Sequence, residues 1–271
     1  MTPRSPNPSH RRNELRESDR PSKTSAWRDE IRESARPFVR LNLAITADGK
    51  IATANRAISA FGSKHDLKRL YQLRHRADAI LCGAGTINAE NADLGPAPAR
   101  PAHPPSAGAR LPLRVIASGR GYLNPEARLF QRAYGPIVIL ATRRISAARR
   151  RRLESLAHTV KICGAREIDF VSALRWLRSK WNVRELLCEG GSQVNAALLA
   201  ADLVDEINLT LCPWIVGGRT SPTLADGHGV ADLAQASPWR LERALRLGNE
   251  LFLRYRRLAG DAQQGRAGSQ T

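Results

Sequence analysis

The stretch "LLCEGGSQVNAALL" (residues 186–199) decides how the rest of the chain is interpreted. An apolar run stops on Glu189, two glycines and Ser192 follow, and apolar residues then return at helical spacing, which predicts a strand, a turn and a helix. Glycines let a backbone come close to a ligand, and a helix N-terminus offers free N–H groups with a partial positive charge. The pyrophosphate of a dinucleotide would fit such a place. The alternative is an ordinary turn in which Ser192 is the helix N-cap.

A second glycine-rich turn has the same position relative to a strand. "CGAGT" (residues 82–86) follows the apolar run 77–83, which we predict to be a short buried strand. Two glycine-rich turns from separate strands would form a crevice if they met at one edge of a sheet. The pair of turns therefore favours a cofactor site.

Strands and helices alternate along the rest of the chain. "FVRLNLAIT" (38–46) has the period of a strand and ends at the turn signal "ADGK", and Ser63 is expected to cap a helix over about 64–76. The other expected elements are strands at 113–118, 136–142, 159–163, 184–188 and 204–216, helices at about 146–156 and 169–181, and a hairpin around Gly248-Asn249. This order predicts an α/β fold with a mostly parallel central sheet flanked by helices and a C-terminal antiparallel hairpin.

Composition divides the chain into three parts. Residues 1–36 are polar and rich in Arg, Ser and Pro, so we expect a disordered basic extension. Residues 37–258 are the expected folded domain, and 259–271 a flexible tail. Within the domain, the Pro- and Ala-rich residues 95–112 are expected to form a surface loop.

The chain has features of a cytoplasmic protein. No apolar run approaches the roughly 20 residues of a membrane span. Arg11-Arg12 lie in a segment without an apolar core, so neither a secretory nor a twin-arginine signal is supported. Four single cysteines without a CxxC pair are expected to be buried apolar residues in a reducing compartment: Cys82, Cys163, Cys188 and Cys212.

The net charge is +18, from 43 basic and 25 acidic residues. Such a surface attracts polyanions, phosphorylated metabolites or nucleic acid, unless it reflects only an arginine-rich genome. The low aromatic content and the lack of RNP-like or zinc-finger patterns disfavour a nucleic-acid module. Zinc-deaminase motifs, a GxSxG turn and metal-ligand spacing among the histidines are also missing, so we expect no metal.

Arg74 differs from a surface arginine. It follows three apolar positions of the expected helix by three, four and seven residues, so it projects from the core-facing side. A cation there either satisfies the helix C-terminus or lines a cleft for an anion, and both interpretations stay open. A run of arginines extends from Arg143-Arg144 to residues 149–152 and is expected to form a solvated helix face. Its first pair, Arg143-Arg144, directly follows the strand end at Thr142, where the extra phosphate of a cofactor could be held.

Three blocks of the sequence carry a family resemblance: "RPFVRLNLAITADGKIATANRAIS" (36–59), "LRHRADAILCGAGT" (73–86) and "LLCEGGSQVNAALLAADLVDEINLTLCPWIVGG" (186–218). They resemble the reductase (C-terminal) domain of the bacterial bifunctional riboflavin-biosynthesis deaminase-reductase (RibD C-terminal type) and the stand-alone archaeal and fungal reductases. The resemblance extends over about residues 37–258, and we expect a stand-alone form.

The resemblance implies a fold, a cofactor and a reaction. The fold would be dihydrofolate-reductase-like, the protein a homodimer, and the cofactor NADPH. The ribosyl group of 5-amino-6-(5-phosphoribosylamino)uracil would be reduced to a ribityl group, by hydride transfer from the nicotinamide to C1′ of a ring-opened imine. The protein would mainly orient its two ligands and stabilise charge.

Site residues follow from the resemblance position by position, with Thr142 and Arg143 added by the strand-end argument. Catalytic roles fall to Asn42, Asp48 and Glu189. Substrate contacts fall to Ser59, Arg74, Glu90 and Leu94. Cofactor contacts fall to Phe61, Thr86, Glu90, Ser118, Thr142, Arg143, Gly190, Gly191, Ser192, Gln193, Val194 and Asn195. On spacing alone, however, single acids at strand ends such as Asp48 and Glu189 are more often turn residues than catalysts.

The sequence departs from the family pattern on the substrate side. Glu90, Ala92 and Ala97 stand where the family usually has Asp, Pro and Arg, and Phe61-Gly62-Ser63 is one residue shorter than the usual Trp-Ile-Thr-Ser. Two alternatives therefore stay open. One is an NADPH reductase of the same fold that acts on a pterin, a folate or another heterocycle. The other is a polyanion-binding protein on a retained reductase scaffold.

Overall fold

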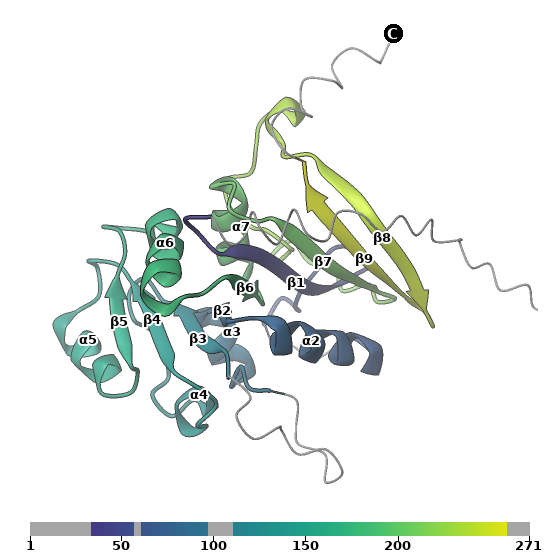
Figure 1. Cartoon of the computed structure of the whole chain (residues 1–271). Helices are drawn as coiled ribbons and strands as arrows, with labels where there is room; N and C mark the ends of the chain where they lie inside the picture. Colours follow the sequence, from purple (N-terminus) through teal and green to yellow (C-terminus); the bar gives the residue numbers. More distant parts are fainter. Residues whose placement is uncertain (1–33, 57–60, 97–110, 259–271) are drawn as a thin grey trace, which may run out of the picture. The chain divides into compact units, whose positions relative to one another are not determined.

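A sheet of nine strands forms the framework of the described part of the chain (Figure 1). The structure, a computed structural model, describes residues 34–56, 61–96 and 111–258. The predictions for Ser59, for residues 1–33 and 259–271, and for most of the loop 95–112 lie outside these ranges. No helix in the described ranges is long and apolar enough to cross a membrane.

The sheet is parallel except at one edge. Its order is β5-β4-β3-β2-β6-β1-β7-β9-β8, and only the hairpin β8–β9 runs antiparallel to its neighbours. The strands are β1 (Phe38–Thr46), β2 (Ala79–Gly83), β3 (Leu113–Ala117), β4 (Ile137–Ala141), β5 (Thr159–Ile162), β6 (Glu185–Cys188), β7 (Glu206–Cys212), β8 (Trp239–Leu247) and β9 (Glu250–Arg257). The predicted fold class is confirmed.

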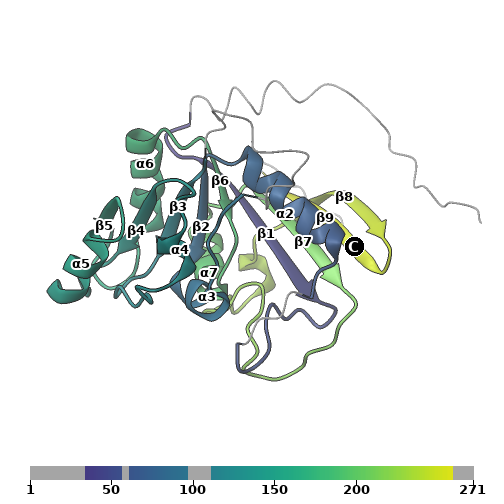
Figure 2. The ribbon, with the colours of Figure 1, turned by 90° about the horizontal axis from the view of Figure 1, so that it is seen from below.

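Helices cover both faces of the sheet (Figures 1 and 2). They are α2 (Lys64–Arg76), α3 (Ala84–Glu90), α4 (Arg128–Gln131), α5 (Ala147–Glu154), α6 (Phe170–Trp181) and α7 (Ser192–Ala200), with a short 3-10 turn at Leu233–Gln235. The strands alternate two apolar sets: Leu81 of β2 packs in the core beneath α6 and α7, whereas Ile80 and Cys82 pack on the opposite face against α3, α4 and α5. Both faces of the parallel part around β2, β3 and β4 are buried, as expected for a parallel sheet, whereas most residues of β8 are exposed.

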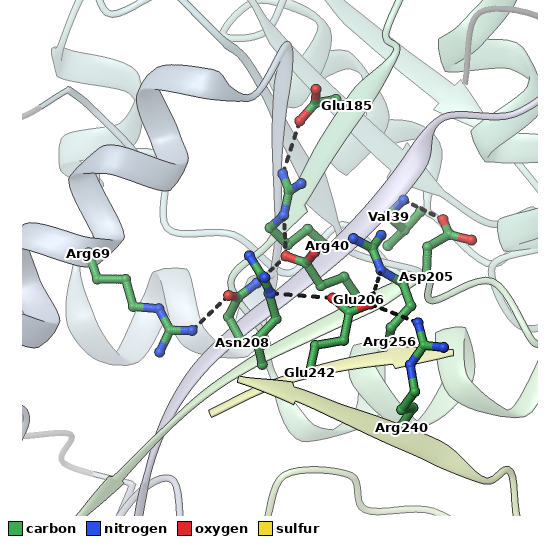
Figure 3. A network of polar contacts seen from close by, with 11 residues as sticks. Val39, Arg40, Arg69, Glu185, Asp205, Glu206, Asn208, Arg240, Glu242 and Arg256 are labelled. Carbon is green, nitrogen blue, oxygen red and sulfur yellow. Dashed lines mark hydrogen bonds and ion pairs between the residues drawn. The ribbon is translucent and has the colours of Figure 1, made fainter. Parts of the chain in front are cut away.

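Charged side chains join α2 to the β1–β7–β9 part of the sheet (Figure 3). Arg40 donates to Glu206 at 2.6 Å, Arg256 pairs with the same carboxylate at 3.0 Å, and Arg69 of α2 donates to Asn208 at 2.7 Å. Although burial acts to raise it, the pKa of Glu206 is lowered by these arginine charges and hydrogen bonds. The ionised carboxylate therefore ties the antiparallel edge to the parallel part of the sheet.

Most element boundaries match the sequence predictions, and one difference has a clear cause. A strand was expected over 204–216, but β7 ends at Cys212. The next residue is Pro213, which lacks an N–H for the ladder and ends the pairing. Beyond it, the carbonyl oxygen of Trp214 accepts the N–H of Ala47, which directly follows β1, at 2.8 Å. All four cysteines are buried and free, as predicted.

Candidate functional site

The strand order reverses at β2-β6-β1, and this is where a ligand crevice is expected. β1 leads through α2 to β2, yet β6, which comes much later in the chain, lies between them. The carboxyl ends of parallel strands share one edge, and in open α/β sheets ligands bind outside that edge at such a switch point. Both glycine-rich turns of the sequence end their strands here, after β2 and after β6.

The two turns touch and form a glycine cradle, made of Gly83, Gly190 and Gly191. The N–H of Gly83 donates to the carbonyl oxygen of Gly190 at 3.0 Å. A Cβ added to Gly191 would lie 3.4 Å from Oγ1 of Thr86 and 3.7 Å from Cα of Gly83. Gly191 also has φ +87°, a conformation that side chains disfavour. Small residues are thus needed on both sides of the cradle.

Helix α7 directs its N-terminus at this cradle. Gly191, not Ser192, is the N-cap, so the alternative of an ordinary Ser192-capped turn is not what forms. The N–H of Asn195 donates to Gly191, and the three amides before it have no backbone partner among the described residues. Free N–H groups beside glycines fit the pyrophosphate of a dinucleotide, which the family resemblance implies.

The side chains of the 190–195 segment have a structural role, in contrast to its main chain, which faces the cradle. Val194 and Asn195 are buried, and a Cβ on Gly83 would lie 3.2 Å from Val194. Nδ2 of Asn195 donates to the carbonyl oxygen of Leu224 at 2.7 Å, which fixes the following loop against α7. Only Gln193 in this segment has an exposed side chain. Contacts of this segment with a cofactor would therefore come mainly from its backbone.

Arg74 and Glu189 form a two-bond ion pair beside the cradle. Nε and Nη2 of Arg74 donate to the Glu189 carboxylate at 2.6 and 2.7 Å, and Nη1 donates to the carbonyl oxygen of Gly95 at 2.7 Å. The core-facing placement of Arg74 is confirmed. Its partner was not predicted from the sequence, because Glu189 was assigned a catalytic role independently. The pair joins one predicted catalytic residue to one predicted substrate-binding residue.

Two further substrate-side assignments lie next to this pair. Partial desolvation and the nearby charge of Glu189 raise the pKa of Glu90 above its usual value. Leu94 is only 1% exposed and packs in the core beneath α3, so its side chain is not available to a ligand. Its φ of +54° is unusual for a bulky residue and marks a constrained turn directly before Gly95.

Asp48 anchors a loop. Its carboxylate accepts from Oγ1 of Thr46 at 2.5 Å and from the N–H groups of Val216 and Gly217 at 3.2 and 2.6 Å. The hydroxyl and backbone bonds lower the pKa of Asp48 to about 2, so it is ionised at neutral pH. Asn42 of β1 is buried, and its Oδ1 has no hydrogen-bond partner among the described residues. A buried oxygen without a partner is free to accept a hydrogen bond from a ligand.

The remaining assignments occupy the ends of β3 and β4 and the start of α2. Thr142 is fully buried, and its hydroxyl donates to the carbonyl oxygen of Gly119 at 2.8 Å, so it joins two loops. Ser118 is buried at the same edge, whereas Arg143 is exposed. Phe61 is half-buried, and its carbonyl oxygen accepts from Nε1 of Trp214 at 3.1 Å. The described residues contain no cluster that could hold a metal ion.

Glu250 is a site-supporting residue that no sequence argument identified. From the start of β9 it accepts the N–H of Ser63 at 2.6 Å and the Ser63 hydroxyl at 2.5 Å, and so binds the N-terminus of α2. The two residues are 187 positions apart, and no local pattern signals such a pairing. Through this contact the hairpin helps to position the helix that carries Arg74.

The cradle, the ion pair and the switch-point sheet define an α/β protein in which two glycine-rich strand ends meet at one edge of the sheet, and comparisons with known proteins agree with this fold. The sequence model of the RibD C-terminal domain family matches residues 37–253. The chain is 34% identical over 221 residues to the 2,5-diamino-6-ribosylamino-4(3H)-pyrimidinone 5′-phosphate reductase of Methanothermobacter thermautotrophicus, covering 81% of this chain and 98% of that relative.

Bifunctional relatives match over part of their length. The RibD protein of Actinobacillus pleuropneumoniae is 28% identical over 225 residues, which are 82% of this chain and 57% of that protein. The solved structure of Acinetobacter baumannii RibD has a TM-score of 0.69 at 19% identity, with 84% of this chain and 60% of that chain covered, and supports the fold. The chain thus spans less than two thirds of these longer relatives.

The chain belongs to the RibD C-terminal domain family, whose named relatives are reductases of riboflavin biosynthesis. The predicted family is confirmed, and membership implies a nicotinamide cofactor, which fits the cradle described above.

Proposed function

We propose that this protein is an NADPH-dependent reductase that reduces the ribosyl group of a ribosylaminopyrimidine 5′-phosphate to a ribityl group. The observation that carries the proposal is the glycine cradle, with the Arg74–Glu189 pair beside it at the strand-order switch point. Two ligands would then lie next to each other: a dinucleotide over the glycines and a substrate over the pair. A bound nicotinamide would supply the hydride.

The chain's own residues would bind and orient. Backbone N–H groups at the start of α7 would hold the pyrophosphate, and glycines would allow its close approach. Arg74 holds the Glu189 carboxylate in one orientation, so that this acid can accept hydrogen bonds from the substrate without losing its position. Asn42 would use its unpaired oxygen on the substrate side. Ser118, Thr142 and Arg143, at the ends of β3 and β4, would lie toward the adenosine end of the dinucleotide.

Two pyrimidines are candidates for the substrate. The sequence resemblance implied 5-amino-6-(5-phosphoribosylamino)uracil. The relative matched over nearly its whole length is named for 2,5-diamino-6-ribosylamino-4(3H)-pyrimidinone 5′-phosphate instead, and this favours the diamino compound. A pterin or folate remains the alternative for the altered segment 90–97. The polyanion-binding function, a homodimer and a cytoplasmic location stay predictions.

The test is NADPH oxidation by the purified protein, followed at the absorbance band of the reduced cofactor. Both pyrimidine phosphates are offered in parallel, with dihydrofolate beside them, and NADH replaces NADPH in a second series. We expect turnover of a pyrimidine phosphate and a higher kcat/KM with NADPH. Turnover of dihydrofolate alone would move the substrate to the alternative, and failure to bind either dinucleotide would contradict the proposal.

A further inference from the structure

A cavity of about 270 Å³ lies between α3, the loop after β3 and α5, on the sheet face opposite α6 and α7. Its lining is divided between apolar and cationic groups. Leu123 and Leu153 are apolar, Tyr122 contributes an aromatic ring that is 54% exposed, and Arg149 and Arg152 contribute guanidinium groups. No acidic side chain lines the cavity. The volume is slightly below the roughly 300 Å³ at which small-molecule pockets usually begin, so the ligand would be small.

The two arginines of this cavity have unused hydrogen-bond donors. The guanidinium carbon of Arg149 lies 3.8 Å from the centroid of the Tyr122 ring, which holds the cation in place. Neither Arg149 nor Arg152 forms an ion pair or a guanidinium hydrogen bond with any residue in the described ranges. Planar guanidinium groups match phosphate oxygens in geometry and charge. Two such groups, without a competing carboxylate, point to an anionic ligand.

The cavity is separate from the glycine cradle, although both contact α3. Thr86 lies against the cradle, whereas Asn88, two positions later, points to the other side of the helix. The Asn88 side chain is held there by two bonds of 3.1 Å, as donor to the carbonyl oxygen of Tyr122 and as acceptor from the N–H of Asn124. The pyrophosphate of a dinucleotide over the cradle would therefore lie on one side of α3 and a ligand in the cavity on the other.

We propose that this cavity is a second binding site, which takes the phosphate ester of a small ring compound of the size of a ribose phosphate. Arg149 and Arg152 would bind the phosphate, and Tyr122 and Leu123 would contact the ring, above the buried Leu153. The proposal does not depend on the reductase activity, because none of these residues belongs to the cradle or to the Arg74–Glu189 pair.

Helix α5 offers a matched control, since four consecutive arginines occupy positions 149–152 and only the first and last line the cavity. Ribose 5-phosphate is titrated calorimetrically into the full chain, saturated with NADP⁺ so that the cradle is filled, and unphosphorylated ribose serves as the blank. We expect Arg149→Ser and Arg152→Ser each to weaken the Kd by about tenfold, through loss of a charge-assisted bond. Arg151→Ser removes the same charge outside the cavity and should change the Kd by less than about twofold, because exposed charges are screened.

Three results would overturn the proposal. Ribose 5-phosphate would fail to bind the wild-type protein, or all three serine variants would weaken it equally, as expected for a diffuse basic surface. In the third, NADP⁺ would displace ribose 5-phosphate in direct competition, which would make the cavity a part of the dinucleotide site. Thermal unfolding of each variant checks that the fold is unchanged, and we expect only small decreases in Tm, the largest for Arg149→Ser, which also loses the contact with the Tyr122 ring.

Discussion

The strength of the Arg74–Glu189 pair can be measured apart from any activity, because it contributes to the free energy of unfolding. The side chains are 12% and 10% exposed and meet through two short bonds. Although burial alone would lower it, the pKa of Arg74 is raised by the charge of Glu189 and by the hydrogen bond between them, so the guanidinium stays protonated. We predict that Glu189→Gln destabilises the protein, since it leaves a largely buried cation without a counter-charge.

The expected magnitude follows from this burial. Removal of one partner from a fully buried pair costs about 3–5 kcal/mol, and the value here should be nearer 2 kcal/mol, because both groups keep some contact with water and glutamine can still accept one bond. In a domain of this size, about 2 kcal/mol corresponds to a decrease in Tm of roughly 4–8 °C. A double-mutant cycle with Arg74→Met should give a coupling energy of about 1.5–3 kcal/mol.

The assay is urea unfolding followed by circular dichroism, and the chain supplies its own control. Arg150 and Glu154 form an ion pair of similar length, 2.7 Å, but their side chains are 51% and 42% exposed. The same cycle on this pair should give only about 0.3–0.5 kcal/mol. Equal coupling energies for the two pairs would refute the argument that burial makes the Arg74–Glu189 pair strong.

Two further predictions concern the cradle and the loop that Asp48 anchors. Gly191→Ala should weaken NADPH binding, measured by cofactor fluorescence. The control is Gly248→Ala, which introduces similar backbone strain at φ +62° in the hairpin turn but meets no atom within 4 Å, and it should leave the affinity for NADPH unchanged. Equal affinities of the two variants would contradict the placement of the pyrophosphate. The difference in free energy of unfolding between wild type and Asp48→Asn should be constant above about pH 4 and decrease from there to about pH 2. The reason is that the pKa of Asp48 in the folded protein, about 2, lies below the usual value of 3.8, so the stabilisation is lost as the carboxylate is protonated. A difference independent of pH over that range would show that the Asp48 bonds do not depend on its charge.

Local sequence patterns were sufficient where the determining contacts are local. The helix expected over 64–76 is observed at Lys64–Arg76, because Ser63 caps it from the adjacent position. The hairpin around Gly248 follows from two extended runs and a turn between them. The expected strand 204–216 was too long, because apolar residues continue past Pro213 while the pairing of the strands ends at Cys212. Apolar residues indicate which part of the chain is buried, whereas the end of a strand depends on the backbone N–H groups, and proline has none.

The sequence by itself determined the family, the fold class and the two glycine-rich turns, because each depends on motifs or periodic patterns within short continuous segments. Tertiary structure alone decided that these turns meet, that Arg74 is paired with Glu189, and that Glu250 binds the start of α2. The partners in these two contacts are 115 and 187 positions apart, and they come together only because β6 inserts between β1 and β2 and the hairpin adds to β7. A side chain's sequence neighbours establish which face it occupies, but the order of the strands in the sheet determines which charge it finds there.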